Sequence, residues 1–237
     1  MKASKRKINL GSRISIVVLL VFVGWSCKST EATTSTKSVS NSSEKANLEE
    51  LYWARIDSSR MNFVQADVDF MTGMIGHHAQ ALIMSDLAPK NGANVQVQTL
   101  ASRIINAQKD EIAAMQKWLR DRKQPVPEVH INGLNLMIHG AGGDHSDHMS
   151  MAGMLTQEQL VELSEAKNET FDKLFLKYMI QHHSGAITMV TKLINTDGAV
   201  QDEESFKLSA DINVDQITEI ERMKLMLSEL SSKDKVE

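Results

Sequence analysis

The sequence predicts an all-α protein, a four-helix assembly made of two helical hairpins that share one design. Three observations predict this class. Aromatic residues make up only 5% of the chain whereas 14 residues are Met, which is typical of a helical core filled by Leu, Ile, Ala and Met. Only 3 Pro and 12 Gly are present, too few for a sandwich rich in strands and turns. One residue pattern also occurs twice, in the first helix of each predicted hairpin.

The N-terminus has the features of a bacterial lipoprotein signal. A basic stretch precedes a short apolar run, 14–23, and residues 24–26 then lead to Cys27, the sole Cys. The run is too short to span a membrane well. We therefore predict that residues 1–26 are removed and that Cys27 carries a lipid. The protein would be exported and anchored in the bacterial envelope, facing the periplasm or in the outer membrane. An ordinary signal peptide, or a signal anchor with a chance Cys, is the alternative.

Removing residues 1–26 changes the charge balance. It leaves 21 of the 26 basic residues and all 30 acidic ones, so the mature chain has a net charge of −9. This charge argues against nucleic acid or an anionic membrane surface as a partner, and membrane contact is expected only through the lipid. The next segment, 27–46, is rich in Ser, Thr and Lys and predicts a flexible tether.

Residues 47–232 form the predicted folded domain. Turns at 89–92 and 195–198 separate its helices, and Thr156 with Gln159 resembles a capping box. No segment alternates polar and apolar residues over a useful length, so the Gly-containing stretch 128–155 is predicted to be a loop that connects the hairpins. The predicted helices are 58–88, 94–122, 156–195 with a kink near Asn168, and 200–230.

The internal repeat covers both helices of each hairpin. Phe70-x3-Met74-x2-His77-His78-x2-Ala81-x2-Met84 recurs as Phe175-x3-Met179-x2-His182-His183-x2-Ala186-x2-Met189. Ile104-x3-Gln108-x2-Glu111-Ile112-x2-Met115 recurs as Ile212-x3-Gln216-x2-Glu219-Ile220-x2-Met223. Because the apolar faces of two such hairpins have to be buried against each other, a single packed domain is expected.

The first helix of each copy carries a His-His pair suited to binding a metal ion. Residues three and four apart share a helix face, so Met74 lies one turn before both His77 and His78. Adjacent histidines point about 100° apart, so one helix alone holds both rings poorly around one ion. Each pair is therefore expected to need the partner helix, the other copy or the connector. The predicted ligands are His77, His78, His182, His183, Met74, Met179, Met115 and Met223.

The second helix of each hairpin has polar residues amid Ile and Met, which are costly to bury without partners. Glu111 and Glu219 are predicted to accept a ring N–H from the His pairs and to fix the tautomer, or to be ligands themselves. Asp67 and Asp172 precede the two pairs at the same offset and are predicted to hydrogen-bond a helix end. The residues expected around the ligands are Glu111, Glu219, Gln108 and Gln216.

The residue types favour copper. Imidazole suits zinc, copper, iron and nickel, whereas a thioether selects copper(I), so Cu+ is favoured over Cu2+ and zinc ranks behind. The chain has no Glu-x-x-His motif of the kind that builds helical di-iron sites. The connector is also rich in His and Met, a composition that signals metal binding although such loops can simply be solvated. Its candidate ligands are His139, His145, His148, Met149, Met151 and Met154.

These motifs resemble the DUF305 family, a domain of unknown function. The resemblance covers about residues 60–230 and is clearest around the second pair, Phe171-Asp172-x2-Phe175-Leu176-x2-Met179-Ile180-x-His182-His183-x-Gly185-Ala186-Ile187-x-Met189. It implies a ferritin-like helical bundle, usually exported and often found with copper-resistance systems, some members of which bind copper. The first copy departs from the second, with Gly73 and Gly76 in place of Tyr178 and Gln181, so the two sites are expected to differ in affinity.

The leading hypothesis is a binding protein that sequesters or buffers copper at the cell envelope, or delivers it, without chemical turnover. A metal-dependent oxidoreductase such as a cuprous oxidase is one alternative, because copper cycles between two states. A structural envelope interaction module with core histidines is another. The expected partners are the metal ion, copper-handling proteins of the envelope and, as an open alternative, further copies of the chain.

Overall fold

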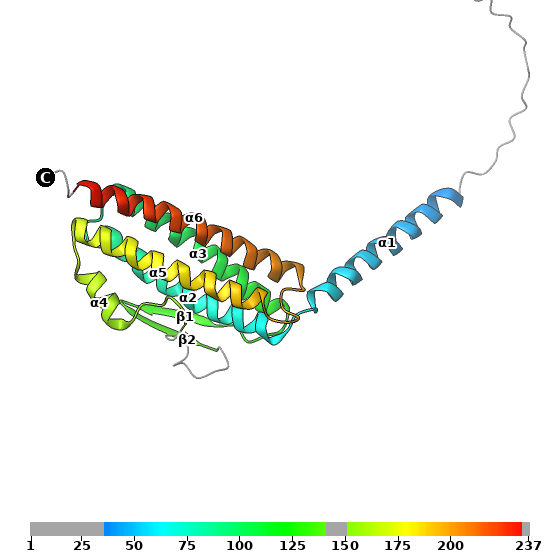
Figure 1. The fold of residues 1–237 in the computed structure, drawn as a ribbon. Helices are drawn as coiled ribbons and strands as arrows, with labels where there is room; N and C mark the ends of the chain where they lie inside the picture. Colours follow the sequence, from blue (N-terminus) through cyan, green and yellow to red (C-terminus); the bar gives the residue numbers. More distant parts are fainter. Residues whose placement is uncertain (1–35, 141–150, 234–237) are drawn as a thin grey trace, which may run out of the picture. The chain divides into compact units, whose positions relative to one another are not determined.

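The computed structural model describes residues 36–140 and 151–233 of the chain (Figure 1). The chain divides into two compact units, 1–47 and 48–237, and every site discussed below lies in the second. No helix among the described residues is long and apolar enough to cross a membrane. The elements are, in order, α1 (Thr36–Arg60), α2 (Gln65–Lys90), α3 (Val95–Asp121), β1 (Glu128–Asn132), β2 (Asn135–His139), α4 (Gln157–Glu165), α5 (Asn168–Ile194) and α6 (Glu203–Lys233).

Four long helices of the second unit lie side by side (Figure 1). Within each repeat copy the two helices pack on each other, α2 on α3 and α5 on α6. Across the copies, α2 contacts α5 and α3 contacts α6. The two helices that carry the His pairs are therefore direct neighbours.

Several helix boundaries follow the sequence prediction. The side chain of Asn94 accepts a hydrogen bond from the Val97 amide at the start of α3, and Thr156 forms a capping box with Gln159 at the start of α4. The kink expected near Asn168 is a break between α4 and α5, where Asn168 has a φ of 52°. The predicted helix 58–88 is wrong at its start, because α1 ends at Arg60 and α2 begins at Gln65. Residues 36–46, predicted to be part of a flexible tether, are helical.

Asp67 and Asp172 connect the two copies at equivalent positions. The carboxylate of Asp67, at the start of α2, accepts hydrogen bonds from the Val64 amide at 3.0 Å and the Val200 amide at 2.8 Å. That of Asp172, near the start of α5, accepts from the backbone amide of Asn94 at 3.1 Å and from its side-chain amide at 2.7 Å. Each aspartate thus binds the backbone just before the second helix of the other hairpin, α6 for Asp67 and α3 for Asp172. The predicted role at a helix end is confirmed.

The prediction of a loop at 128–139 is wrong, because these residues form a β-hairpin. β1 and β2 pair antiparallel from Glu128 opposite His139 to Asn132 opposite Asn135. The two-residue connection begins with Gly133 at a φ of 61°, and a positive φ at that position is typical of tight hairpin turns. Each strand has only five residues, which is too short for an alternating pattern to predict it from the sequence.

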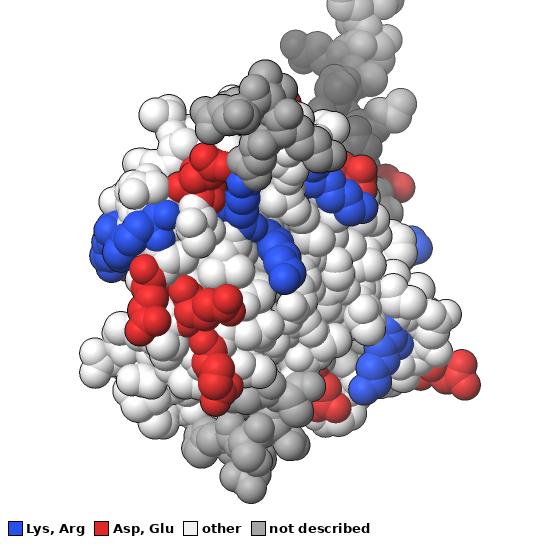
Figure 2. Space-filling view, turned by 60° about the vertical axis from the view of Figure 1, so that its left-hand side comes forward, with Lys and Arg blue, Asp and Glu red and all other residues white. Residues whose placement is uncertain are grey.

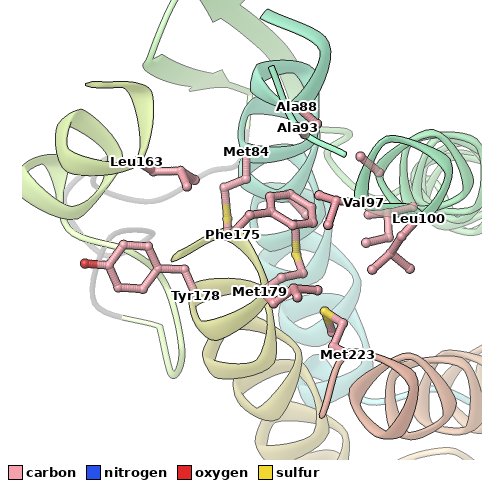
Figure 3. Packing of buried hydrophobic residues seen from close by; sticks show 14 of the residues in the cluster. Met84, Ala88, Ala93, Val97, Leu100, Leu163, Phe175, Tyr178, Met179 and Met223 are labelled. Carbon is pink, nitrogen blue, oxygen red and sulfur yellow. The ribbon is translucent and has the colours of Figure 1, made fainter. Parts of the chain in front are cut away.

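The core consists of two hydrophobic clusters. One lies mainly between α2, α4, α5 and the ends of α3 and α6, and Figure 3 shows Met84, Phe175, Met179 and Met223 within it. The other contains Met71, Met74, Ile75, Met115, Trp118 and Leu119 together with parts of α5 and α6. Charged side chains lie outside these clusters, and the face drawn in Figure 2 carries them in small separate groups among a wide uncharged area.

Candidate metal centre

The four paired histidines lie in the middle of the contact between α2 and α5. All four side chains are 0% exposed. The ring centres of His77 and His182, the first members of the two pairs, are 3.9 Å apart with a 39° angle between the ring planes. The two rings of one pair are farther apart, 6.5 Å for His77 and His78 and 6.1 Å for His182 and His183. Adjacent histidines therefore point apart as the helix geometry predicts, and the two copies meet through their inner rings.

The outer histidines are bound to the glutamates of the second helices. His78 Nε2 lies 2.7 Å from Glu111 Oε2, and His183 Nε2 lies 2.6 Å from Glu219 Oε2. A carboxylate only accepts, so each ring donates its Nε2–H and keeps the lone pair on Nδ1. A carboxylate that fixes the tautomer of a histidine in this way is the usual support of a metal-binding imidazole. The predicted His–Glu contacts are thus present in both copies.

Several buried ring nitrogens have no hydrogen-bond partner. They are Nδ1 of His77, His78 and His183, and both ring nitrogens of His182. His77 differs from its counterpart because its Nε2 donates to the carbonyl oxygen of Ala152 at 3.1 Å. A buried polar atom without a partner costs about 1–3 kcal/mol, and proteins rarely leave several of them together. The inner rings therefore keep unused nitrogen lone pairs inside the core.

The inner rings are held in the neutral form. The pKa of His77 is lowered to about 3, mainly by burial and also by the neighbouring His78 and His183, while the hydrogen bond to Ala152 acts in the opposite direction. Burial lowers the pKa of His182 well below its usual value, and the nearby His77 contributes in the same direction. Neutral imidazole is the form that binds metals, so these rings need not lose a proton before binding at neutral pH.

Two buried glutamines flank the His–Glu pairs. Gln108 and Gln216 are 1% and 2% exposed; both amide atoms of Gln108 and the amide oxygen of Gln216 lack a partner. Both line a pocket of about 150 Å³ between α3 and α6, together with Glu111 and Glu219. One water molecule takes up about 30 Å³, so this pocket can hold several. The outer side of each His–Glu pair therefore has a route to solvent.

The methionines of the repeat lie in the hydrophobic clusters. Met74 and Met115, from α2 and α3, share one cluster, and Met179 and Met223, from α5 and α6, share the other. All four side chains are 0% exposed. They occupy equivalent positions in the two repeat copies.

The connector packs against α2 and α5 at one repeat position, three residues after the first histidine of each pair. Gln80, in the first copy, holds Leu155 by two hydrogen bonds, to its amide at 2.7 Å and its carbonyl at 3.0 Å. Its counterpart in the second copy is Gly185, where a Cβ would lie 1.9 Å from the Ala152 oxygen. Neither residue was among the predicted site residues, although position 80/185 is one where the two copies differ.

The connector candidates divide into three groups. Met151 and Met154 lie within the residues that the structure describes. The Met151 sulfur lies beside Gly73, 3.2 Å from the place that a Cβ on Gly73 would take. His139 lies on β2, near His130 rather than the paired histidines. His145, His148 and Met149 lie outside the described residues.

No three His, Cys, Asp or Glu side chains within 36–140 and 151–233 are placed to hold one metal ion together. The inner ring pair offers two nitrogen ligands, so a complete coordination shell needs a further ligand type or a shift of the side chains. A low coordination number with soft ligands suits a soft monovalent ion such as copper(I) better than zinc, which takes four ligands in structural sites.

The fold and this site define a mostly helical protein with paired histidines buried between two repeat copies. The model of the DUF305 family, a domain of unknown function, matches residues 67–227. The chain belongs to this family. No curated protein matches it.

Several solved structures resemble the chain. A DUF305 fragment from Deinococcus radiodurans is 27% identical, with a TM-score of 0.57, over 70% of this chain and 98% of that one. A DUF305 protein from Streptomyces coelicolor shares the fold at 23% identity, with a TM-score of 0.58, over 70% of this chain and 92% of that one. CopM in its Cu(II)-bound form is 30% identical, with a TM-score of 0.51, over 69% of this chain and 96% of that one. CopM has also been solved in Cu(I)-bound and Ag-bound forms.

Proposed function

We propose that this protein binds copper at the cell envelope through the histidines buried between α2 and α5. The observation that carries this proposal is the contact of His77 with His182. Their rings come from the two repeat copies, their centres are 3.9 Å apart, and three of their four nitrogens have no partner although both side chains are fully buried.

A purely structural role explains these rings poorly. A core histidine retained for packing should have at least one ring nitrogen hydrogen-bonded, as Nε2 of each outer histidine is to Glu111 or Glu219, whereas His182 has neither. The inner rings instead combine a lowered pKa with unused lone pairs, which are the requirements for metal ligation. A bound ion would satisfy the nitrogens that the protein leaves unpaired.

Copper(I) is the ion that the surroundings favour. The core beside the rings is apolar and contains Met74, Met115, Met179 and Met223, and thioether sulfur selects copper(I) over zinc. CopM, which is 28–30% identical, has been solved with Cu(I), Cu(II) and silver bound. We therefore propose Cu+ as the main ligand, Cu2+ as a weaker one and silver as a mimic.

The cellular role that fits is sequestration, buffering or delivery rather than turnover. In this proposal Cys27 carries a lipid, the duplicated hairpins form one ferritin-like four-helix bundle, and the bundle acts near the membrane of the envelope. The buried site would hold copper away from solvent, and copper-handling proteins of the envelope would supply or receive it.

Copper(I) titration of the full-length protein tests the proposal. The measurement is competition with a chromophoric chelator under anaerobic conditions, for the wild type and for a His77→Leu/His182→Leu variant. We expect the variant to lose one bound equivalent. A matched control, Leu87→Ile, changes a partly buried residue of α2 that packs on the core far from the inner rings. Equal stoichiometry and affinity in the wild type and the double variant would refute the proposal.

A further inference from the structure

The β-hairpin presents a second group of His, Met and Glu side chains, separate from the buried pairs. Side chains alternate between the two faces of a strand, so Glu128 and His130 of β1 share a face. The register places His139 opposite Glu128 and Met137 opposite His130. All four residues are exposed, and they belong to the same face of the hairpin.

The other face of the hairpin attaches it to the helices. Val129 and Leu136 are partly buried against the core clusters, and Ile138 is 6% exposed. Both strands contact α2. The hairpin is therefore fixed in position by one face, and the face with Glu128, His130, Met137 and His139 is directed to solvent.

The two hairpin histidines are close enough to share an ion. Their ring centres are 5.3 Å apart, with an angle of 57° between the planes. A ring nitrogen binds such a metal at about 2.0 Å and lies roughly 1 Å from its ring centre, so two rings that share an ion have centres within about 6 Å. At 5.3 Å, two rings that share an ion would hold it in a bent N–metal–N arrangement, which would leave a side of the ion open to a third ligand.

Met137 is placed to supply that ligand. It lies directly opposite His130, and its side chain is 46% exposed, so the thioether is accessible from solvent on the same face as the ring of His130. Glu128 lies opposite His139, and its Oε2 is 3.8 Å from His130 Nε2. The carboxylate can accept a ring N–H and orient an imidazole, as supporting groups of metal sites do.

We propose that this hairpin face is a surface site for a soft monovalent cation, copper(I) or silver(I), with His130, His139 and Met137 as ligands and Glu128 as a positioning residue. Two imidazoles and a thioether are a soft set that discriminates against hard cations. The exposed position suits capture of an ion from solvent or from another protein. The site does not depend on metal binding by the buried histidines.

Silver(I) and copper(I) titrations of the full-length protein test this site. The measurements are made in the wild type and in the His77→Leu/His182→Leu background, so that loss at the hairpin is seen apart from loss at the buried rings. A His130→Asn/His139→Asn variant should bind one equivalent fewer in both backgrounds, with only a small change in melting temperature because both residues are exposed.

Single substitutions identify the ligand set. Met137→Leu should weaken copper(I) binding at this site by at least about tenfold and leave zinc(II) binding within about twofold, because only the soft ion uses the thioether. Ile131→Leu, on the opposite face and 43% exposed, is the matched control and should change neither. Unchanged copper(I) and silver(I) stoichiometry in the double variant would overturn the proposal, as would equal losses of zinc(II) and copper(I) in Met137→Leu.

Discussion

Replacing an inner and an outer histidine by the same residue should have opposite effects on stability. His182 lies fully buried with both ring nitrogens unpartnered, whereas His183, the next residue, donates to Glu219 at 2.6 Å. His182→Leu removes a donor and an acceptor that the metal-free protein leaves unsatisfied. His183→Leu instead removes the partner of a carboxylate that is only 18% exposed.

The magnitudes follow from the hydrogen-bond inventory. Each unsatisfied buried polar group costs about 1–3 kcal/mol, and some of the gain from removing two of them is offset by imperfect packing of Leu. We expect His182→Leu to raise the free energy of unfolding of the metal-free protein by about 2 kcal/mol, which is about 4–8 °C in melting temperature for a domain of this size. His183→Leu should lower it by about 1–3 kcal/mol.

Thermal unfolding with and without copper(I) measures both effects. The His130→Asn/His139→Asn background removes the contribution of the hairpin. At a free ion concentration about a hundredfold above the dissociation constant, a single site adds about 2.7 kcal/mol of stability, and His182→Leu should lose this increment. The reasoning is refuted if His182→Leu destabilises the metal-free protein as much as His183→Leu and keeps the full stabilisation by copper(I).

Three further outcomes follow from the site. Between pH 6.5 and 4.5 the metal-free protein should lose about 2 kcal/mol of stability through His77 in urea titrations, because its folded pKa is about 3 and only the unfolded chain takes up the proton in this window. His182, whose pKa burial also lowers, acts in the same direction, and a flat profile contradicts this. Gly185→Ala should displace the connector, because the new Cβ would lie 1.9 Å from the Ala152 oxygen. The backbone amides of residues 151–155 should then exchange hydrogen faster, and unchanged exchange rates contradict this. Glu219→Gln should weaken copper(I) affinity by about 10–100-fold in chelator competition, with Glu221→Gln, an exposed position of the same helix, as the control; equal affinities contradict a supporting role.

The helical class and the His–Glu contacts could be predicted from the sequence because the repeat encodes them locally. Residues three and four apart share a helix face whatever the tertiary structure, so Met74 and His78 are placed by spacing alone. Because the pattern is duplicated, a hydrogen bond between His78 and Glu111 predicts an equivalent one between His183 and Glu219. Both hydrogen bonds are present.

The contact between the inner rings could not be derived in this way. It depends on α2 and α5 packing at one register, which spacing within a helix does not determine. The asymmetry of the site also depends on tertiary structure, because Ala152 reaches His77 only where Gly185 leaves space. The hairpin was missed since two five-residue strands give too few alternations to separate from a Gly-rich loop.

X-ray absorption at the copper edge tests the central claim most directly. The sample is the full-length His130→Asn/His139→Asn protein loaded with one equivalent of copper(I), compared with the same protein that also carries His77→Leu/His182→Leu. The account predicts imidazole scattering with nitrogen at about 2.0 Å in the first sample, and its loss together with the bound copper in the second. Copper bound in both samples with the same imidazole signal would contradict it.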